Sequence, residues 1–244
     1  MAGAENSVSS TLIEVADLAK TFGRRQALAD VDLTLNAGEV MGFVGPNGAG
    51  KTTTLRILAG LLKADRGTGH VLGAPVRGGR DAIRSLVGYM PQRLALYGEL
   101  TVEQNLAFRA EVYCLPKPRE AVAAIIERFG LGEHRRQRAA WLSGGWARLL
   151  QFAASVIHGP RLILLDEPTA GLDAHAKLEV WRRIGLFADE GAGIIVNTHD
   201  LIEAEQCDRV AIFAMGRIVA TGDPASVAAG LSIRTLLVDC EPGL

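Results

Sequence analysis

The sequence predicts an α/β fold in which a parallel sheet forms the core, with an antiparallel β flap and an inserted α-helical subdomain. Between residues 162 and 213, short apolar runs alternate with helix-compatible stretches, which is typical of a parallel sheet with helices on both faces. Two stretches before residue 36 alternate apolar and polar side chains, which favours antiparallel strands. A capping box at residues 101–104 and apolar residues at helical spacing over residues 121–129 indicate a mostly helical insertion from residue 101 to about 159.

Length and composition are those of an ordinary globular protein, with 244 residues, 48% of them apolar and 22% charged. No window approaches the ~18 consecutive apolar residues of a membrane-spanning helix, and the start lacks a signal-peptide pattern, so we expect a cytosolic chain. A net charge of −1 offers no basic field for a phosphate backbone, so we expect no nucleic-acid partner. The scattered Cys114, Cys207 and Cys240 argue against a disulfide framework or a zinc site.

The predicted flap consists of strands over residues 12–18 and 31–35, which lead through a turn into an apolar strand at residues 40–44. Phe22 is expected on the connection between the first two strands. An exposed aromatic ring there could stack on an adenine base, and a packed turn residue is the alternative.

Residues 45–53 match the pattern G-x-x-x-x-G-K-[ST] and lie between the apolar strand and a helix-compatible run. Glycines let the backbone turn its N–H groups around a polyphosphate, and the helix that starts near Lys51 adds the positive end of its dipole. Lys51 would reach the β- and γ-phosphates, and the Thr52 hydroxyl would ligate Mg²⁺. The sequence therefore predicts the parallel sheet of a P-loop NTPase, with a nucleotide bound by Gly45, Pro46, Asn47, Gly48, Ala49, Gly50, Lys51, Thr52 and Thr53.

The middle of the chain predicts two short strands and then helices. The strands are expected at residues 70–72 and 86–90. A capping box at residues 101–104 opens a helix to about Tyr113, which Pro116 and Pro118 end. A second helix over residues 121–129 stops at Gly130. The basic run at residues 134–138 is interpreted as a solvated loop, with a docking surface for a partner or lipid head groups as the alternative.

The last third of the chain predicts alternating strands and helices. Strands are expected at residues 162–165, 194–196 and 210–213, and helices at residues 174–188 and 201–206. A hairpin turn at Met215 and Gly216 and a short helix after Pro224 follow. A last strand over residues 234–240 is compatible with continuation into a longer tandem protein.

The strand at residues 162–167 delivers two adjacent carboxylates at its carboxyl end, where ligands bind in open α/β sheets. Neighbouring side chains on a strand point opposite ways, so the two acids have different tasks. Asp166 suits Mg²⁺ coordination, and Glu167 suits polarising the water that attacks a γ-phosphate. The alternative is an apolar strand that ends in two solvated acids.

With these motifs in order, residues 12–223 resemble the nucleotide-binding domain of ATP-binding cassette (ABC) proteins. The resemblance implies the ABC ATPase fold over residues 12–230, with a RecA-like core at about 12–91 and 160–222, a helical subdomain at about 92–159, a flexible tail at 1–11 and a C-terminal extension at 231–244. The matching motifs are Walker A at 45–53, the Q-loop residue Gln92, the signature at 142–145, Walker B at 162–167, the D-loop residue Asp173 and the switch residue His199.

The resemblance also implies roles for residues in the chain's own site. Phe22 matches the aromatic residue that stacks on adenine, and Gln92 matches a ligand of Mg²⁺ beside Thr52 and Asp166. Glu167, His199 and Lys51 match the catalytic residues of the family. The implied cofactors are ATP and Mg²⁺.

The signature residues Ser143, Gly144 and Gly145 have a different role in the family. Ser143 is a natural N-cap, so its hydroxyl, the glycine N–H groups and a helix N-terminus gather at one anion-binding spot. In the family this spot covers the γ-phosphate held by a second ATPase domain, so that two domains close head to tail around two ATP molecules.

The signature then departs from the usual Gln, any residue, Gln, Arg, because this chain has Trp146, Ala147, Arg148 and Leu149. Tryptophan at the first position is similar to ATPases of the ABC-2 export class. The departure predicts that this signature binds the ATP of the second domain weakly, and therefore that the two ATP sites of the dimer are unequal. The alternative is that these side chains pack differently without a functional effect.

The resemblance implies an ATP-hydrolysing subunit or domain of a multidrug-like ABC-2 exporter, bound to a membrane permease at the cytoplasmic face of the cell membrane. Apolar side chains at Leu94, Leu96, Tyr97 and Leu100 are expected to dock on that permease. A soluble ABC ATPase acting on DNA or ribosomes is the alternative, disfavoured by the short stretch between Gln92 and the signature. A regulatory module that does not hydrolyse ATP is disfavoured by Glu167 and His199.

Overall fold

The computed structural model describes residues 11–230. The expected tail at residues 1–10 and the expected strand at residues 234–240 lie outside the described residues. Thr11, assigned to the tail from the sequence, is already the first residue of a strand. Within residues 11–230, no helix has the length and apolar character needed to cross a bilayer.

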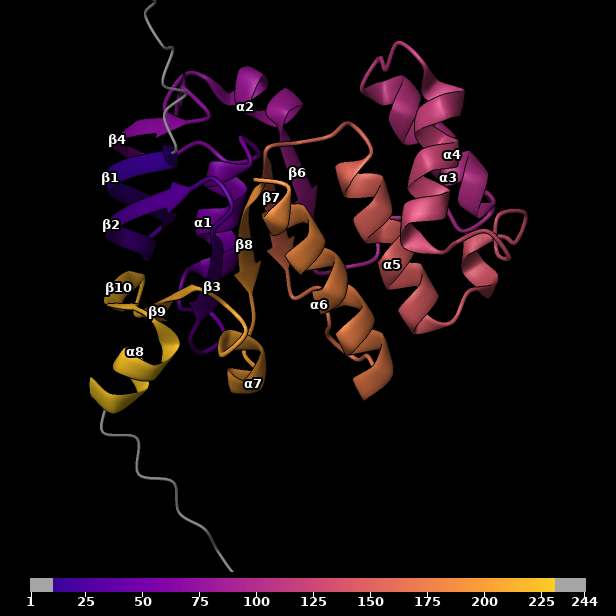
Figure 1. Ribbon diagram of the computed structural model, residues 1–244. Coiled ribbons are helices and arrows are strands. Elements are labelled where there is room, and N and C mark those ends of the chain that lie inside the picture. The colour runs from indigo at the N-terminus through magenta and orange to yellow at the C-terminus, as the bar shows by residue number, and fades with distance from the viewer. Residues whose placement is uncertain (1–10, 231–244) are drawn as a thin grey trace, which may run out of the picture.

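The core is a six-stranded sheet in the order β10-β9-β3-β8-β7-β6 (Figure 1). β3 pairs in parallel with both β8 and β9, and β7 pairs in parallel with β8 and β6, as the sequence predicts. Only β10 is antiparallel, through its hairpin with β9. The strands are β3 (Val40–Val44), β6 (Val87–Met90), β7 (Leu162–Asp166), β8 (Gly193–Asn197), β9 (Arg209–Ala214) and β10 (Arg217–Gly222).

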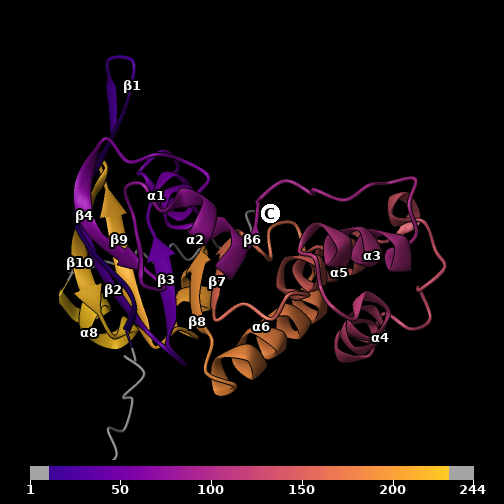
Figure 2. The same ribbon diagram turned by 90° about the horizontal axis from the view of Figure 1, so that it is seen from above.

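The flap is a separate antiparallel sheet in the order β2-β1-β4-β5. β1 (Thr11–Phe22) lies between β2 (Arg25–Asn36) and β4 (Arg66–Val71), and β5 (Ala74–Pro75) pairs with β4. Helix α1 (Lys51–Leu58) lies between the flap and the core sheet in Figures 1 and 2. Its apolar residues join both sheets in one buried cluster. Phe22 ends β1 and is not in the connection itself.

The helical subdomain stands beside the sheet (Figure 2) and contains α3, α4, η1 and α5. The capping box is confirmed, because the Thr101 hydroxyl accepts from the Gln104 N–H and the Gln104 side chain accepts from the Thr101 N–H. Pro118 does not end the preceding segment but is the first residue of α4, where its missing N–H costs nothing. The elements are α3 (Val102–Val112), α4 (Pro118–Phe129), the 3₁₀ helix η1 (Ala139–Trp141) and α5 (Gly144–Val156).

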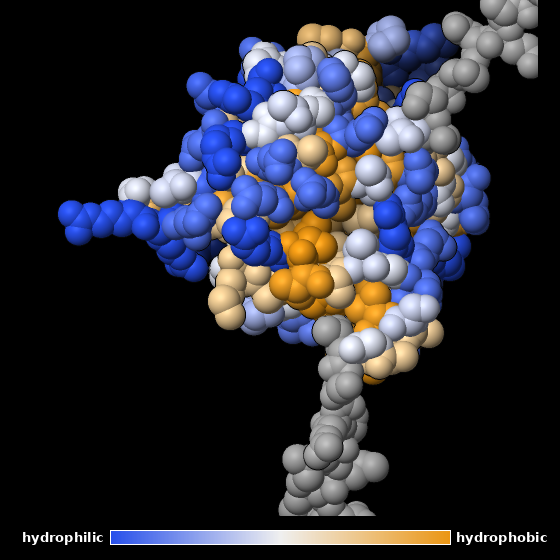
Figure 3. Space-filling view, turned by 90° about the vertical axis from the view of Figure 1, so that its left-hand side faces the viewer, coloured by the Kyte–Doolittle hydropathy of each residue, from blue (hydrophilic) through white to orange (hydrophobic). Residues whose placement is uncertain are grey.

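The other face of the core sheet is covered by α5 and by α6, whose buried residues cluster with those of β7 and β8. Helix α2, which includes Leu86, was not predicted, because it buries only Ile83 and lacks a capping side chain. Figure 3 shows the flap side of the molecule, where hydrophilic residues surround a hydrophobic patch. The remaining helices are α2 (Arg80–Leu86), α6 (Ala174–Asp189), α7 (Leu201–Ala204) and α8 (Pro224–Gly230).

Candidate active site

The loop between β3 and α1 has a backbone that only glycine can adopt at two positions. Gly45 has φ 145°, and a Cβ there would lie 2.2 Å from the carbonyl oxygen of Phe213. Gly50 has φ 111°, and a Cβ there would lie 2.6 Å from the Leu28 side chain. The β3 residues before the loop are fully buried, so the strand holds the loop firmly in place.

Lys51 begins α1 and is buried, with its ammonium folded over the loop. Its Nζ donates to the carbonyl oxygens of Gly45, at 2.6 Å, and Pro46, at 3.1 Å. Burial lowers the pKa of Lys51, and the nearby carboxylates of Glu167 and Asp166 oppose that shift. A buried cation beside a ring of N–H groups is a strong site for a polyphosphate.

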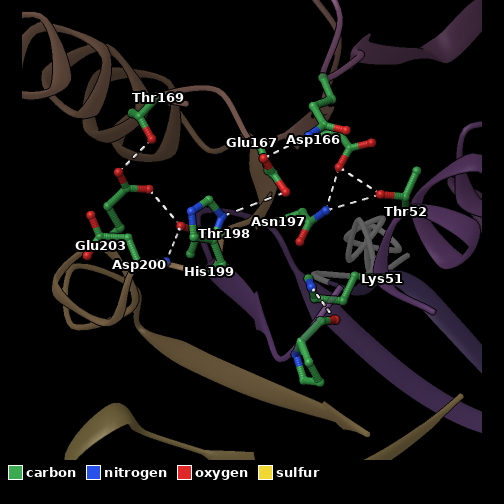
Figure 4. A network of polar contacts seen from close by, with 12 residues as sticks. Lys51, Thr52, Asp166, Glu167, Thr169, Asn197, Thr198, His199, Asp200 and Glu203 are labelled. Atoms are coloured by element: carbon green, nitrogen blue, oxygen red, sulfur yellow. Dashed lines mark hydrogen bonds and ion pairs between the residues drawn. The ribbon is translucent and has the colours of Figure 1, made fainter. Parts of the chain in front are cut away.

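Thr52, Asp166 and Asn197 form a polar cluster behind the loop (Figure 4). The Thr52 hydroxyl donates to Asp166 Oδ1 at 3.0 Å, and the Asn197 amide donates to the same oxygen. Burial raises the pKa of Asp166, and these hydrogen bonds oppose the rise. A hydroxyl and a carboxylate oxygen this close together are the hard ligands that Mg²⁺ prefers, so the donor set fits the ion.

Asn197 is a site residue that the sequence reasoning missed. In the sequence, Asn197 stands two places before His199 and is none of the matching motif residues. In the parallel sheet, Asn197 on β8 is the register partner of Asp166 on β7. The sequence signal that could have indicated Asn197 is its position at the carboxyl end of a buried strand, where ligands bind in a parallel sheet.

Glu167 is half-buried and has φ 50°, so its backbone leaves the strand direction directly after Asp166. Its Oε2 accepts a hydrogen bond of 2.9 Å from Gln92 Nε2, and its Oε1 lies 3.7 Å from His199 Nδ1. The two acids face different partners, because β7 ends at Asp166 and the backbone turns away at Glu167, and not because of strand alternation as the sequence predicted. Gln92, predicted as a Mg²⁺ ligand, contacts Glu167 and not the Thr52–Asp166 pair.

A cavity of about 510 Å³ lies over the loop and is large enough for a nucleotide. Phe22 lines this cavity and is 49% exposed, so its ring is free on one side for a base, and a packed turn residue is disfavoured. The other lining residues include Asn47, Gly48, Gly50, Lys51, Thr52, Thr53, Gln92, Glu167 and Asn197.

The signature and D-loop residues lie at helix starts outside this cavity. Ser143 is the N-cap of α5, and its hydroxyl accepts from Trp146 N at 3.5 Å. Asp173 is the N-cap of α6, and its carboxylate accepts from Ala176 N at 2.9 Å. Ser143 and Gly144 are exposed, and Gly145 is half-buried. The fold therefore leaves this spot open to a group from outside the chain.

The residues that depart from the usual signature are all engaged within the chain. Leu149 is buried in the core of the helical subdomain. The Trp146 ring lies against His134, with ring centroids 4.5 Å apart. Arg148 donates to the carbonyl oxygen of Gln92. These contacts favour the interpretation that the side chains pack differently from the usual polar set.

The family model described as "ABC transporter" matches residues 28–170. The chain belongs to the ABC transporter family. "Probable multidrug ABC transporter ATP-binding protein YbhF" of Escherichia coli (strain K12) is 38% identical over 90% of this chain and 38% of its own length. "Daunorubicin/doxorubicin resistance ATP-binding protein DrrA" of Streptomyces peucetius is 37% identical over 95% of this chain and 71% of its own. The chain thus spans well under half the length of YbhF.

A solved structure of this family has the same fold. The structure of cbiO1 from Clostridium perfringens, described as part of the ABC transporter complex cbiONQ, has a TM-score of 0.82 and 28% identity. The likeness covers 90% of this chain and 91% of that one. The ABC ATPase fold predicted from the sequence, with its flap and inserted helical subdomain, is therefore confirmed.

Proposed function

We propose that this chain is the ATP-hydrolysing subunit or domain of an ABC-2 type exporter, in which closure of two such domains around MgATP drives a membrane permease. The observation that carries the proposal is the setting of Glu167. Its carboxylate accepts a hydrogen bond from Gln92 and faces His199 at the edge of the phosphate-loop cavity. A carboxylate held there can orient a water and take its proton as the water attacks the terminal phosphate.

The nucleotide would lie along the loop, with its base on Phe22 and its phosphates against the N–H groups of residues 45–53. Lys51 would move from the loop carbonyls to the phosphates, and His199 would stabilise the transferred charge. Thr52, Asp166 and the amide oxygen of Gln92 would hold Mg²⁺, which neutralises phosphate charge when it is bound.

A second ATPase domain is proposed as the partner that completes the site. Ser143 and Gly144 are exposed at the start of α5, where N–H groups and the helix dipole favour an anion. No residue of this start lines the chain's own cavity, so its anion would come from the ATP of the other domain.

A membrane permease is the second proposed partner, and it would hold the chain at the cytoplasmic face of the membrane. Of the residues expected to dock, Leu94 and Tyr97 are exposed, whereas Leu96 packs against the core and Leu100 is half-buried, so these two do not fit the expectation. The further exposed apolar side chains of the helical subdomain are Phe108 and Val112. The names of YbhF and DrrA refer to multidrug transport and to drug resistance. Both names support export as the direction of transport.

The experiment that tests the proposal is the variant Glu167→Gln, which keeps the size of the side chain and removes its basicity. We expect unchanged ATP binding and a fall in turnover of roughly 10²- to 10⁴-fold, as loss of a general base causes. Glu205→Gln, at an exposed glutamate of the same protein, is the matched control. Turnover that stays at the wild-type level in Glu167→Gln would refute the assignment.

A further inference from the structure

Glu203 is a buried carboxylate near Glu167 and His199, and it does not line the cavity over residues 45–53. It lies on α7 and is 3% exposed. Its Oε1 accepts from the Thr169 hydroxyl at 2.5 Å, and its Oε2 accepts from the Thr198 hydroxyl at 2.8 Å (Figure 4). Both oxygens therefore have hydrogen-bond partners, as a buried carboxylate requires.

The two threonines belong to the two segments that carry the proposed catalytic groups. Thr169 follows Glu167 by two residues, and Thr198 directly precedes His199. The Thr198 hydroxyl also accepts from the Asp200 N–H at 3.0 Å, so it fixes the backbone on both sides of His199. One carboxylate thus joins the segment of Glu167 to the segment of His199.

Lys177 of α6 adds a third attachment. Its Nζ donates to Asp200 Oδ2 at 2.7 Å and lies 3.1 Å from Glu203 Oε1. The hydrogen bond to Asp200 raises the pKa of Lys177 and lowers that of Asp200, so both remain charged near neutral pH. The ammonium compensates the buried charge of Glu203, which a carboxylate in a dry site needs.

His199 cannot hold its own position. Its side chain is 65% exposed, and its Nδ1 is 3.7 Å from Glu167 Oε1, which is too long for a hydrogen bond. Among residues 11–230, no hydrogen bond holds the exposed imidazole, so its place beside Glu167 depends on the backbone of residues 198–200. That backbone is held by the Thr198 hydroxyl, and Glu203 holds the hydroxyl.

We propose that Glu203 is a positioning residue for ATP hydrolysis, which keeps the His199 segment at a fixed distance from Glu167. The inference rests on the proposed roles of Glu167 and His199. Glu203 touches neither ATP nor the attacking water, and it acts through Thr198 and Thr169. A displacement of a catalytic group by even ~1 Å lowers a rate by as much as 10²-fold. The rate of hydrolysis therefore depends on the hydrogen bonds of Glu203 with Thr198 and Thr169.

The first test compares Glu203→Leu with Glu203→Gln in steady-state ATP hydrolysis. Leucine removes both acceptors, and we expect kcat to fall about tenfold or more while KM for ATP stays within about twofold. Glutamine keeps one acceptor and offers a donor to the other hydroxyl, so we expect it to recover most of kcat. Glu205→Gln, on the same short segment but exposed, is the control. A rise in KM with unchanged kcat would overturn the proposal.

If Glu203→Leu does not fold, variants that each remove one hydrogen bond to Glu203 test the same positioning role. Thr169→Val and Thr198→Val conserve side-chain shape and each remove one contact with Glu203, and we expect both to lower kcat with KM preserved. A purely structural role would lower the midpoint of thermal unfolding and leave kcat at low temperature unchanged. That result would refute the inference.

A double-mutant cycle with His199→Ala separates this inference from the proposed function. If Glu203 acts through His199, the double variant Glu203→Leu/His199→Ala should hydrolyse ATP no more slowly than His199→Ala alone. If the two substitutions instead lower kcat by factors that multiply in the double variant, Glu203 does not position His199. If Glu167→Gln and His199→Ala leave turnover unchanged, the proposed function fails. If these two lower turnover but the Glu203 and threonine variants do not, only the positioning role fails.

Discussion

The guanidinium of Arg148 donates a hydrogen bond to the backbone carbonyl oxygen of Gln92, and the two atoms lie 2.6 Å apart. The side chain of Gln92 in turn donates to Glu167. Burial lowers the pKa of Arg148, and the charge of Glu167 opposes that shift. The N-terminal half of α5 is thereby tied to the proposed catalytic carboxylate of the same chain, although the sequence suggested a role at the opposite ATP site.

Arg148→Ala is expected to lower the rate of hydrolysis. The variant leaves the Gln92 carbonyl without its donor, so the Gln92 side chain is held less firmly against Glu167. We expect kcat to fall several-fold with unchanged ATP affinity, measured by steady-state turnover and by equilibrium binding of a fluorescent ATP analogue. Arg136→Ala, at an exposed arginine of the same subdomain, is the control. Equal turnover in both variants would show that the contact has no part in hydrolysis.

The parts of the fold that the sequence predicts are those set by local chemistry. Gly45 and Gly50 are required by backbone angles within the loop, and the caps at Thr101 and Ser143 bond within three residues. Each of these is visible in a short window of sequence.

The parts that the sequence did not predict depend on contacts between distant segments. Asn197 reaches Asp166 only because β7 and β8 are neighbours in register. Glu203 gathers Thr169, Thr198 and Lys177 from three segments, and no spacing rule links these positions. Arg148 meets Gln92 only after α5 packs beside β6. Pattern reading therefore finds the residues of the motifs and misses the residues that position them.

Tyr97 is the position where we expect contact with a permease. Its side chain is 52% exposed, and buried Asn105 bonds both its N–H and its carbonyl, so the segment is held rigidly. Leu100, the other position predicted to cross-link, is half-buried, so a cysteine there would be less accessible to the permease. Tyr97→Cys should form cross-links with the co-expressed permease in membranes, detected as a new band on a non-reducing gel. Val219→Cys, equally exposed on β10, should not, and equal cross-linking by both would contradict a specific docking site.

We expect His158 to make the stability of the fold depend on pH. Its ring stacks on Tyr113 with centroids 3.8 Å apart, and burial lowers its pKa from 6.5 to about 4. Between pH 6.5 and pH 4 the imidazole takes up a proton in the unfolded chain but not in the folded one. The contribution of His158 to the free energy of unfolding is therefore complete above pH 6.5 and is lost as the pH falls toward 4. We expect a loss of roughly 1–2 kcal/mol once partial exposure is allowed for.

His158→Phe keeps the aromatic stack and removes the titration. Urea unfolding at pH 7.5 and pH 5 should therefore show a smaller difference in free energy for this variant than for the wild type. His70→Phe, at an exposed histidine, should keep the wild-type difference. An unchanged difference in His158→Phe would assign the acid sensitivity to other groups.

The last prediction concerns whether the altered signature weakens a dimer of this chain. Trp146 packs on His134, Arg148 bonds to Gln92, and Leu149 lies in the core, so none of the three is left free to disturb an ATP bound by another domain. Replacing Leu149 by the usual arginine would force a charge into an apolar core and unfold the helix, so the informative change is Trp146→Gln. In the background of Glu167→Gln, which we expect to bind ATP without hydrolysing it, Trp146→Gln should leave ATP-dependent dimerisation unchanged in analytical ultracentrifugation. A clear gain in dimer would instead support two unequal sites caused by this helix.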